Sequence, residues 1–285
     1  MYDFLSIQLT APLSEQNGSA GSCFGIMRIM KRKIICALTG VTFMAAAAAA
    51  SLFFSTAKVN RTKYPVFGVD VSNYQGDINW NELEAQDVSF AFIKATEGSG
   101  HTDESVRRNL DMAAETGIRV SAYHFFSFDS AGETQADNFI AAVGKDEIDM
   151  PPVIDIEYYA DKRSNKPTQE ETEAILRPLL ERLEAYYGTK PIIYSTLPVY
   201  FRYIRENFSD YPLWIRSVNF EPDLLSWKFW QYSDKGTLTG YHGDEEHIDL
   251  NVYNGSAEDF DREFAKLSKK ADASQSADKT GKDIK

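Results

Sequence analysis

Eight short apolar runs, each typical of a buried β-strand, follow one another along the middle of the chain. They occupy residues 66–71, 90–96, 119–126, 151–157, 191–195, 213–217, 228–233 and 248–252. Helical patterns separate the first six, whereas only a turn-like segment lies between the last two. Alternating strands and helices predict a parallel sheet. We therefore predict an α/β fold, an irregular, TIM-barrel-like eight-stranded (β/α) barrel with helices missing after the late strands.

The helical patterns carry their own start and stop signals. Ser130 with Glu133 and Thr168 with Glu171 have the spacing of capping boxes. Gly117 suits the C-terminal cap of the helix before it, because glycine adopts a left-handed conformation easily. The predicted helices lie at 78–86, 103–116, 130–143, 168–188, 199–207 and 256–267.

The barrel domain, residues 64–267, is flanked by segments of other composition. A basic cluster at 31–33 precedes an uncharged, Ala-rich run at 34–54, and small residues follow at 55–57. This pattern predicts that 30–57 is a signal peptide or a membrane anchor, and either one exports the domain from the cytoplasm. Residues 1–29 form an unassigned N-terminal extension, and the polar residues 268–285 are predicted to be a disordered tail.

Charge and cysteine content exclude two further possibilities. The net charge is −12, from 30 basic and 42 acidic residues, which argues against nucleic acid as a partner. The cysteines, Cys23 and Cys36, both precede the domain, so residues 58–285 form no internal disulfide. The domain must therefore be held by its core alone.

Acidic residues stand at the ends of several predicted strands. Asp155 and Glu157 end the fourth strand, and alternation places both side chains on one face. Two neighbouring carboxylates repel, so one should hold its proton more tightly, as a general acid requires. Asp70 ends the first strand, Glu97 follows the second and Asp249 lies in the eighth. Since the first and eighth strands meet when a barrel closes, Asp70 and Asp249 should be neighbours. The site of such a barrel gathers at strand ends, so the acids at positions 70, 155, 157 and 249 are expected to share one groove. The alternative for these acids is a set of solvated strand ends.

Six short motifs, taken in order, resemble those of the glycoside hydrolase family 25 lysozymes, the Chalaropsis-type muramidases. The resemblance covers about residues 67–254. The motifs are Asp70-Val71-Ser72 with Gln75-Gly76, the segment Phe92-Ile93-Lys94-Ala95-Thr96-Glu97-Gly98, Tyr123-His124-Phe125, Asp155-Ile156-Glu157, Trp230-Gln231-Tyr232 and Asp249-Leu250-Asn251. Asp87 and His101 depart from the residues expected there, which concerns local loop shape and not the acids.

The resemblance implies a peptidoglycan hydrolase that cleaves the β-1,4 bond between N-acetylmuramic acid and N-acetylglucosamine. Glu157 would donate a proton to the leaving oxygen, and Asp70 with Asp249 would position Glu157 and the sugar hydroxyls. Asp155 would stay ionised and act as a nucleophile, as an inverting base, or as the group that orients the attacking acetamido group of the sugar. We favour the third role.

Aromatic side chains near the strand ends are candidates for stacking on sugar rings, with core packing as the alternative for each. The candidates for substrate binding are Tyr123, Tyr158, Tyr194, Trp214 and Trp230, together with Tyr232, Gln231 and Glu97.

We predict no metal and no cofactor. His242 and His247 lie among acidic residues, but in a turn-like segment without helical metal-ligand spacing. The expected partner is the peptidoglycan glycan strand, with membrane anchoring through 34–54 as an additional contact, and the domain is expected to be a monomer. The rival interpretations are a non-catalytic wall-binding module and a chitinase or endo-N-acetylglucosaminidase.

Overall fold

The computed structural model describes residues 59–265. The predicted extension (1–29), the signal peptide or anchor (30–57) and the tail (268–285) lie outside these residues, so those predictions remain untested. Within 59–265, none of the helices is long and apolar enough to cross a bilayer.

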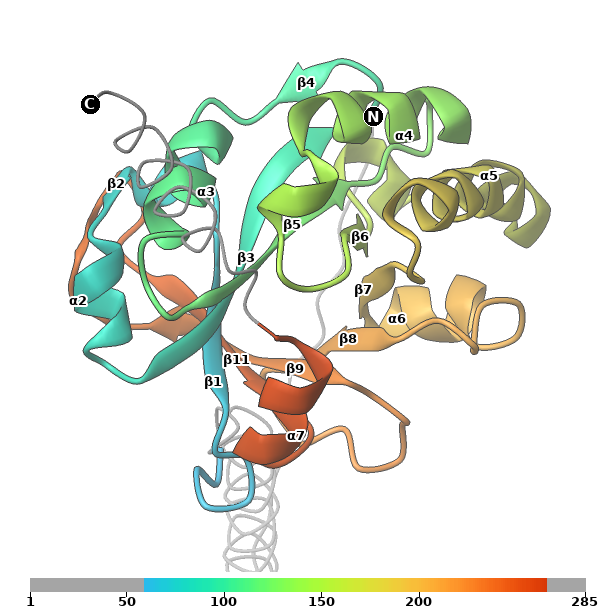
Figure 1. The fold of residues 1–285 in the computed structure, drawn as a ribbon. Helices are drawn as coiled ribbons and strands as arrows, with labels where there is room; N and C mark the ends of the chain where they lie inside the picture. The colour runs from blue at the N-terminus through green and yellow to red at the C-terminus, as the bar shows by residue number, and fades with distance from the viewer. Residues whose placement is uncertain (1–58, 266–285) are drawn as a thin grey trace, which may run out of the picture. The chain divides into compact units, whose positions relative to one another are not determined.

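The described residues form a closed barrel of eight strands, as the sequence predicts (Figure 1). Closure comes from β1, which pairs with β3 on one side and with β11 on the other. The barrel strands are β1 (Phe67–Val71), β3 (Val88–Glu97), β5 (Arg119–Phe125), β6 (Val153–Ile156), β7 (Ile192–Thr196), β8 (Leu213–Arg216), β9 (Phe229–Gly236) and β11 (Ile248–Tyr253).

The barrel sheet is mixed, and the prediction of a parallel sheet is wrong for its last strand. β11 runs antiparallel to β9 and β1, whereas the other neighbouring barrel strands are parallel. A parallel return needs a crossover of about a dozen residues or more, usually through a helix. The segment between β9 and β11 contains only the two-residue strand β10 (Tyr241–His242), which pairs with β2 (Asp77–Ile78). A further short strand, β4 (His101–Thr102), pairs with the end of β3.

Helices surround the early strands, and no helix follows β8 or β9 directly among the described residues, as predicted. The α-helices are α2 (Trp80–Glu84), α3 (Val106–Ala113), α4 (Gly132–Ala142), α5 (Gln169–Tyr187), α6 (Leu197–Val199) and α7 (Ala257–Glu263). Shorter helical turns are η1 (Asn73–Gln75), η2 (Lys145–Glu147), η3 (Ala160–Arg163) and the π-type turn η4 (Tyr200–Ile204).

One predicted cap is confirmed and two are wrong. The Thr168 side chain accepts from the Glu171 backbone, and Glu171 reaches back to Thr168. The N-cap of α4 is Ala131, and the Ser130 hydroxyl instead donates to the Ser127 hydroxyl and accepts from the Ser99 hydroxyl. Helix α3 ends at Ala113, and the Gly117 N–H donates to a Glu84 carboxylate rather than closing the helix.

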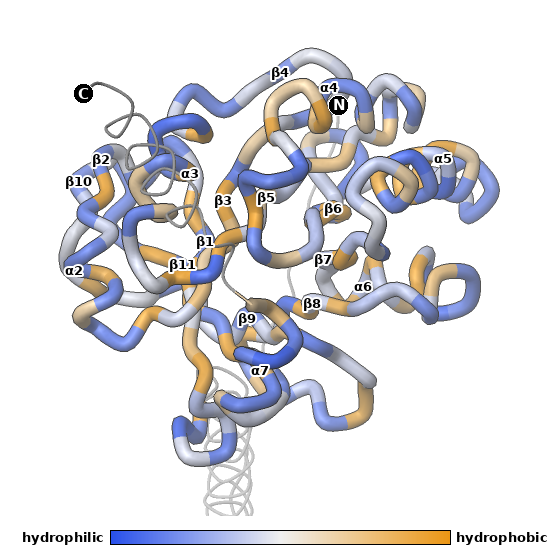
Figure 2. The backbone as a smooth tube through the Cα atoms, in the orientation of Figure 1, coloured by the Kyte–Doolittle hydropathy of each residue, from blue (hydrophilic) through white to orange (hydrophobic). Residues whose placement is uncertain are grey.

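The barrel interior is an aromatic core on which the polar site rests. Apolar residues, orange in Figure 2, recur along β1, β3 and β5. Phe92 of β3 is fully buried, stacks on Trp214 at 4.2 Å between ring centroids, and meets Phe229 edge-on at 5.1 Å. A second apolar layer packs between the outer strand faces and the helices.

We expect Phe92→Ala to lower the free energy of unfolding by about 3–5 kcal/mol, because it empties a volume between two buried rings that are held by strands. Chemical denaturation of wild type and variant measures the difference. Phe220→Ala is the matched control, since this phenylalanine is 56% exposed. A loss in Phe92→Ala no larger than in the control would show that the interior relaxes around the gap.

Candidate active site

The acids predicted to converge come from three strands and meet at one end of the barrel. Asp70 is the last residue but one of β1, and Asp155 is the last residue but one of β6. Glu157 follows directly after the end of β6. Because β11 runs antiparallel, its second residue, Asp249, reaches the same end. Asp70 and Asp249 are directly paired across β1 and β11, as barrel closure predicts.

All four acids line a single cavity of about 180 Å³. A neighbouring cavity of about 250 Å³ shares Asp70 and Asp249 with it and continues past Tyr74 toward Glu245. The wall of the first cavity consists of Asp70, Ser72, Tyr74, Lys94, Tyr123, Phe125, Asp155, Glu157, Tyr194, Trp214, Gln231 and Asp249. Together the two spaces are a polar groove with aromatic walls.

Gln231 joins the acids of β1 and β11. Its Nε2 donates to Asp70 Oδ2 and to Asp249 Oδ2, both at 2.9 Å. Its Oε1 accepts from the Tyr194 hydroxyl at 2.8 Å. Asn251 Nδ2 also donates to Asp70 Oδ2, at 2.7 Å. The side chain of Gln231 is thus fully engaged within the protein, which fits a residue that orients the acids.

Burial shifts the proton affinities of these paired acids. It raises the pKa of Asp70 to about 6, although the hydrogen bonds from Asn251 and Gln231 lower it. Burial, followed by the charge of Asp70, raises the pKa of Asp249 to about 9. Asp249 therefore carries a proton at neutral pH and leaves the negative charge on Asp70.

The pKa values of the second pair, Asp155 and Glu157, are also raised. Burial first, then the charges of Glu157 and Asp70, raise the pKa of Asp155 well above its usual range. Burial also raises the pKa of Glu157, while the cation of Arg216 opposes the rise. Asp155 Oδ1 is buried, and no described residue donates a hydrogen bond to it. An isolated, buried carboxyl oxygen beside a second acid is an environment suited to acid catalysis.

Comparison with known proteins decides the family. The family model for glycosyl hydrolases family 25 matches residues 69–241. The chain belongs to glycosyl hydrolase family 25. It is therefore a glycoside hydrolase, and the resemblance in its motifs is confirmed.

Relatives and solved structures agree with this assignment. Lysozyme M1 of Streptomyces globisporus is 31% identical over 208 residues, which are 67% of this chain and 69% of that protein. The structure of a family 25 glycosyl hydrolase from Bacillus anthracis is 47% identical with a TM-score of 0.69, covering 73% of this chain and 97% of that one. A lysozyme structure from Streptomyces coelicolor is 31% identical with a TM-score of 0.57, covering 68% and 94%.

Several predicted binding residues of this family 25 enzyme line the groove. Tyr123, Tyr194 and Trp214 face the cavity. Their rings belong to the interior aromatic core, and the Trp214 Nε1 donates to Asn251 Oδ1 at 2.8 Å. These side chains therefore belong both to the core and to the cavity wall.

Gln231, also a predicted binding residue, is part of the cavity wall, but the structure does not bring the remaining four into the cavity. Trp230 and Tyr232 alternate with Gln231 on β9 and therefore lie on the outer barrel face, where they pack with Tyr64 and Trp227. Tyr158 points away from Glu157 for the same reason and packs against Phe128 and Tyr203. Glu97 is exposed at the rim and pairs with Lys94 at 3.0 Å.

Sequence reasoning missed several polar or aromatic residues of the site, Ser72 and Phe125 of the cavity wall among them. Lys94 and Tyr74 line the cavity, Asn251 holds Asp70, and the Arg216 charge acts on Glu157. The signal for Lys94 and Asn251 was alternation, because each lies two residues from an inward-facing Phe92 or Asp249. Tyr74 and Arg216 have no comparable signal, since a helical turn and a strand end place them. Within 59–265, no group of three or more His, Cys, Asp and Glu side chains is arranged to hold a metal ion.

Asp249 makes the stability of this family 25 enzyme depend on pH. Its pKa rises on folding from an ordinary 3.8 to about 9, so its stabilising contribution is full below pH 3.8 and is lost as pH rises toward 9. We expect Asp249→Asn to remove this loss, because the amide keeps the shape without the buried charge. Thermal unfolding at pH 4, 7 and 9 measures this difference. The melting temperature of the variant should rise relative to that of wild type as pH increases. Equal pH profiles for the two proteins would contradict the assignment.

Proposed function

We propose that this family 25 enzyme is a lysozyme, an N-acetylmuramidase that cleaves the β-1,4 bond between N-acetylmuramic acid and N-acetylglucosamine in peptidoglycan. The main support is the cavity at the barrel end that collects Asp70, Asp155, Glu157 and Asp249. The names of the relatives support the substrate, because several are described as lysozymes.

Glu157 is the proposed proton donor. Its side chain is half-buried in the cavity wall, and burial raises its pKa. The carboxyl therefore stays protonated at a higher pH than an ordinary glutamate does. Protonation of the leaving oxygen lowers the barrier to breaking the glycosidic bond. The positive charges of Arg216 and Lys94 act on Glu157 and limit how far its pKa rises.

Asp155 is the proposed orienting residue. In the free enzyme, burial and then the charges of Glu157 and Asp70 raise the pKa of Asp155, which opposes the ionised form that its proposed role requires. The N–H of a sugar acetamido group would supply the hydrogen bond that Asp155 Oδ1 lacks. This bond favours the ionised form of Asp155 and leaves the proton on Glu157. The acetamido oxygen then attacks the anomeric carbon as the glycosidic bond breaks, and water later opens the ring so formed.

This route predicts retention of configuration at the anomeric carbon, because two successive displacements restore it. Proton NMR of the first product, recorded before mutarotation, reads the anomer directly. An inverted first product would exclude both the acetamido route and a covalent Asp155 intermediate, and would leave Asp155 as the base.

Export of the domain is a further part of the proposal, because peptidoglycan lies outside the cytoplasm. Support comes from the basic cluster and the apolar run at 34–54. N-terminal sequencing of the mature protein separates a cleaved signal peptide from a retained anchor. Recovery of the intact chain only from the cytoplasm would contradict export.

The substrate is tested with two purified polymers. The full chain should clear a suspension of peptidoglycan and release muramic acid reducing ends, and it should leave chitin unchanged. Clearing of chitin but not peptidoglycan would favour a chitinase-type glycosidase, and clearing of neither would favour a wall-binding protein.

A further inference from the structure

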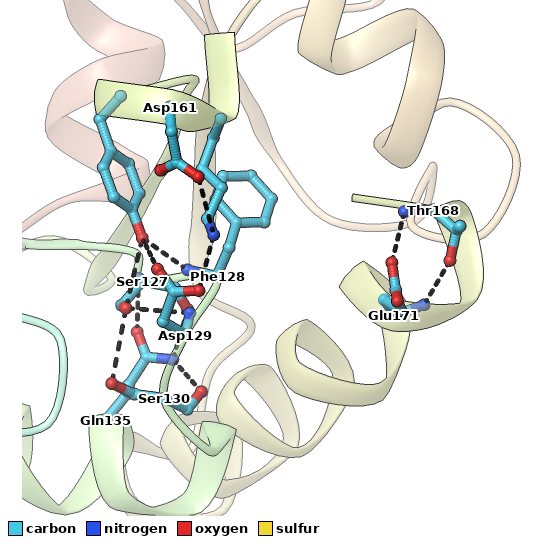
Figure 3. A network of polar contacts seen from close by, with 10 residues as sticks. Ser127, Phe128, Asp129, Ser130, Gln135, Asp161, Thr168 and Glu171 are labelled. Atoms are coloured by element: carbon cyan, nitrogen blue, oxygen red, sulfur yellow. Dashed lines mark hydrogen bonds and ion pairs between the residues drawn. The ribbon is translucent and has the colours of Figure 1, made fainter. Parts of the chain in front are cut away.

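A hydrogen-bonded clamp holds the segment that follows Glu157. The Tyr159 hydroxyl accepts from the Phe128 backbone N–H at 3.0 Å and donates to Asp129 Oδ2 at 3.2 Å. Lys162 Nζ donates to Asp129 Oδ1 at 2.7 Å, from a side chain that is only 13% exposed. Figure 3 shows Asp129 at the centre of these contacts, beside Ser127 and Phe128. The segment 159–162 is therefore fixed at two points to the loop between β5 and α4.

The loop that carries Asp129 is itself rigid. Gln135 Nε2 donates to the carbonyls of Ser127 and Ser130, at 2.9 and 2.8 Å, and Gln135 Oε1 accepts from the Ser127 N–H at 2.7 Å. The same Oε1 lies 3.0 Å from His124 Nε2. Because the Gln135 amide nitrogen already has two carbonyl acceptors, its oxygen must be the acceptor here, and His124 carries its proton on Nε2.

His124 completes this support from the buried side. Its Nδ1 lies 2.7 Å from the Thr96 hydroxyl, and with the proton on Nε2 this contact runs from the hydroxyl to the ring. Thr96, His124 and Gln135 are fully buried. Burial lowers the pKa of His124 to about 4, so the ring is neutral in ordinary conditions. Thr96 of β3 and His124 of β5 thus connect the loop that carries Asp129 to the ends of two barrel strands.

The clamped segment contains a backbone conformation that needs support. Ala160 has φ +43°, in the left-handed region that non-glycine residues rarely adopt. A side chain strains the backbone in this conformation, so surrounding contacts must hold the segment in place. The Tyr159 ring supplies some of them, against Phe125 and Phe128 with centroids 5.6 and 5.9 Å away. Phe125 is also a wall of the catalytic cavity.

We propose that Tyr159 is a positioning residue: by clamping the segment after β6 onto Asp129, it fixes the carboxyl of Glu157 in the groove and keeps the guanidinium of Arg163 near it. This rests on the proposed role of Glu157 as proton donor. Arg163 ends the clamped turn, and its Nε donates to the Tyr158 carbonyl at 3.4 Å.

The charges that face Glu157 make this positioning measurable. They are Asp70 of β1, Lys94 of β3, Asp155 of β6, Arg163 of η3 and Arg216 of β8. Burial raises the pKa of Glu157, and Arg163 is among the cations that lower it. Of these five charges, only Arg163 is held through the clamp. Removing Arg163 should therefore move the basic limb of the activity profile to higher pH, but only while the clamp keeps it near Glu157.

The test is a double-mutant cycle with Tyr159→Phe and Arg163→Gln, read as kcat and KM against pH on glycan fragments. We expect Tyr159→Phe to lower kcat about tenfold to a hundredfold with little change in KM, because a small displacement of the acid is costly. Arg163→Gln should shift the basic limb upward in the wild-type background and much less with Tyr159→Phe. Tyr186→Phe, on the exposed side of α5, is the matched control.

Two outcomes would overturn the proposal: a kcat for Tyr159→Phe within twofold of the control, or an equal Arg163→Gln shift in both backgrounds. If Tyr159→Phe does not fold, Asp129→Ala takes its place in the cycle. An active Glu157→Gln would instead overturn the proton-donor assignment, whatever the cycle shows.

Discussion

We expect Glu157→Gln to lower kcat on peptidoglycan by about 10²- to 10⁴-fold, the usual contribution of a positioned general acid. Glutamine keeps the shape of glutamate but has no proton to give to the leaving oxygen. The fold should be unaffected, because the change removes a charge from a cluster in which burial and Asp70 already disfavour it. Release of reducing ends from purified peptidoglycan measures the rate, and thermal unfolding checks the fold.

The control for this experiment is Glu181→Gln, on the exposed face of α5. It has the same chemical change far from the groove and should retain wild-type activity. A Glu157→Gln enzyme that keeps more than about a tenth of wild-type kcat would show that another group supplies the proton.

We expect Asp155→Asn to reduce kcat by about 10²- to 10³-fold, similar to the loss of a preorganised electrostatic group. The proposed reaction places positive charge on the acetamido group as it attacks, and a neutral amide does not stabilise that charge. The variant should unfold at an equal or higher temperature, because Asp155 is 8% exposed and burial disfavours its charged form, a cost that the neutral amide does not have. Asp146→Asn, exposed in η2, is the matched control.

The two measurements on Asp155→Asn separate its roles. A large loss of rate with gained stability fits a residue that sacrifices stability for catalysis. A loss of rate with an equally large loss of stability would make Asp155 structural. An unchanged rate would remove it from the reaction.

Much of the barrel was predictable because its information is local. Each strand is a short apolar run, and each helix has a 3.6-residue pattern, so both appear in the order of residues. The predicted Ser130 cap failed because the Ser130 hydroxyl bonds the hydroxyls of Ser127 and of Ser99, which is distant in sequence. The antiparallel β11 was missed because strand direction depends on how the chain returns, which a turn-like segment does not reveal.

The candidate site divides in the same way. The positions of Asp70, Asp155, Glu157 and Asp249 at strand ends were sufficient to predict their convergence, once a closed barrel was assumed. The sequence did not predict which aromatic side chains face the groove, because Trp230 and Gln231 are adjacent and point to opposite sides of the strand. The face that a strand turns inward depends on register, and register is set by pairing with β8 and β11.

The sequence alone therefore determined the eight-strand succession, the acids at the strand ends and the motifs of family 25. Tertiary structure decided the direction of β11, the division of the aromatics between groove and outer core, and the burial that raises the pKa values of the acids. The physical reason is that burial and cross-strand contacts join residues such as Asp70, Gln231 and Asp249, which are far apart along the chain and meet only when the barrel closes.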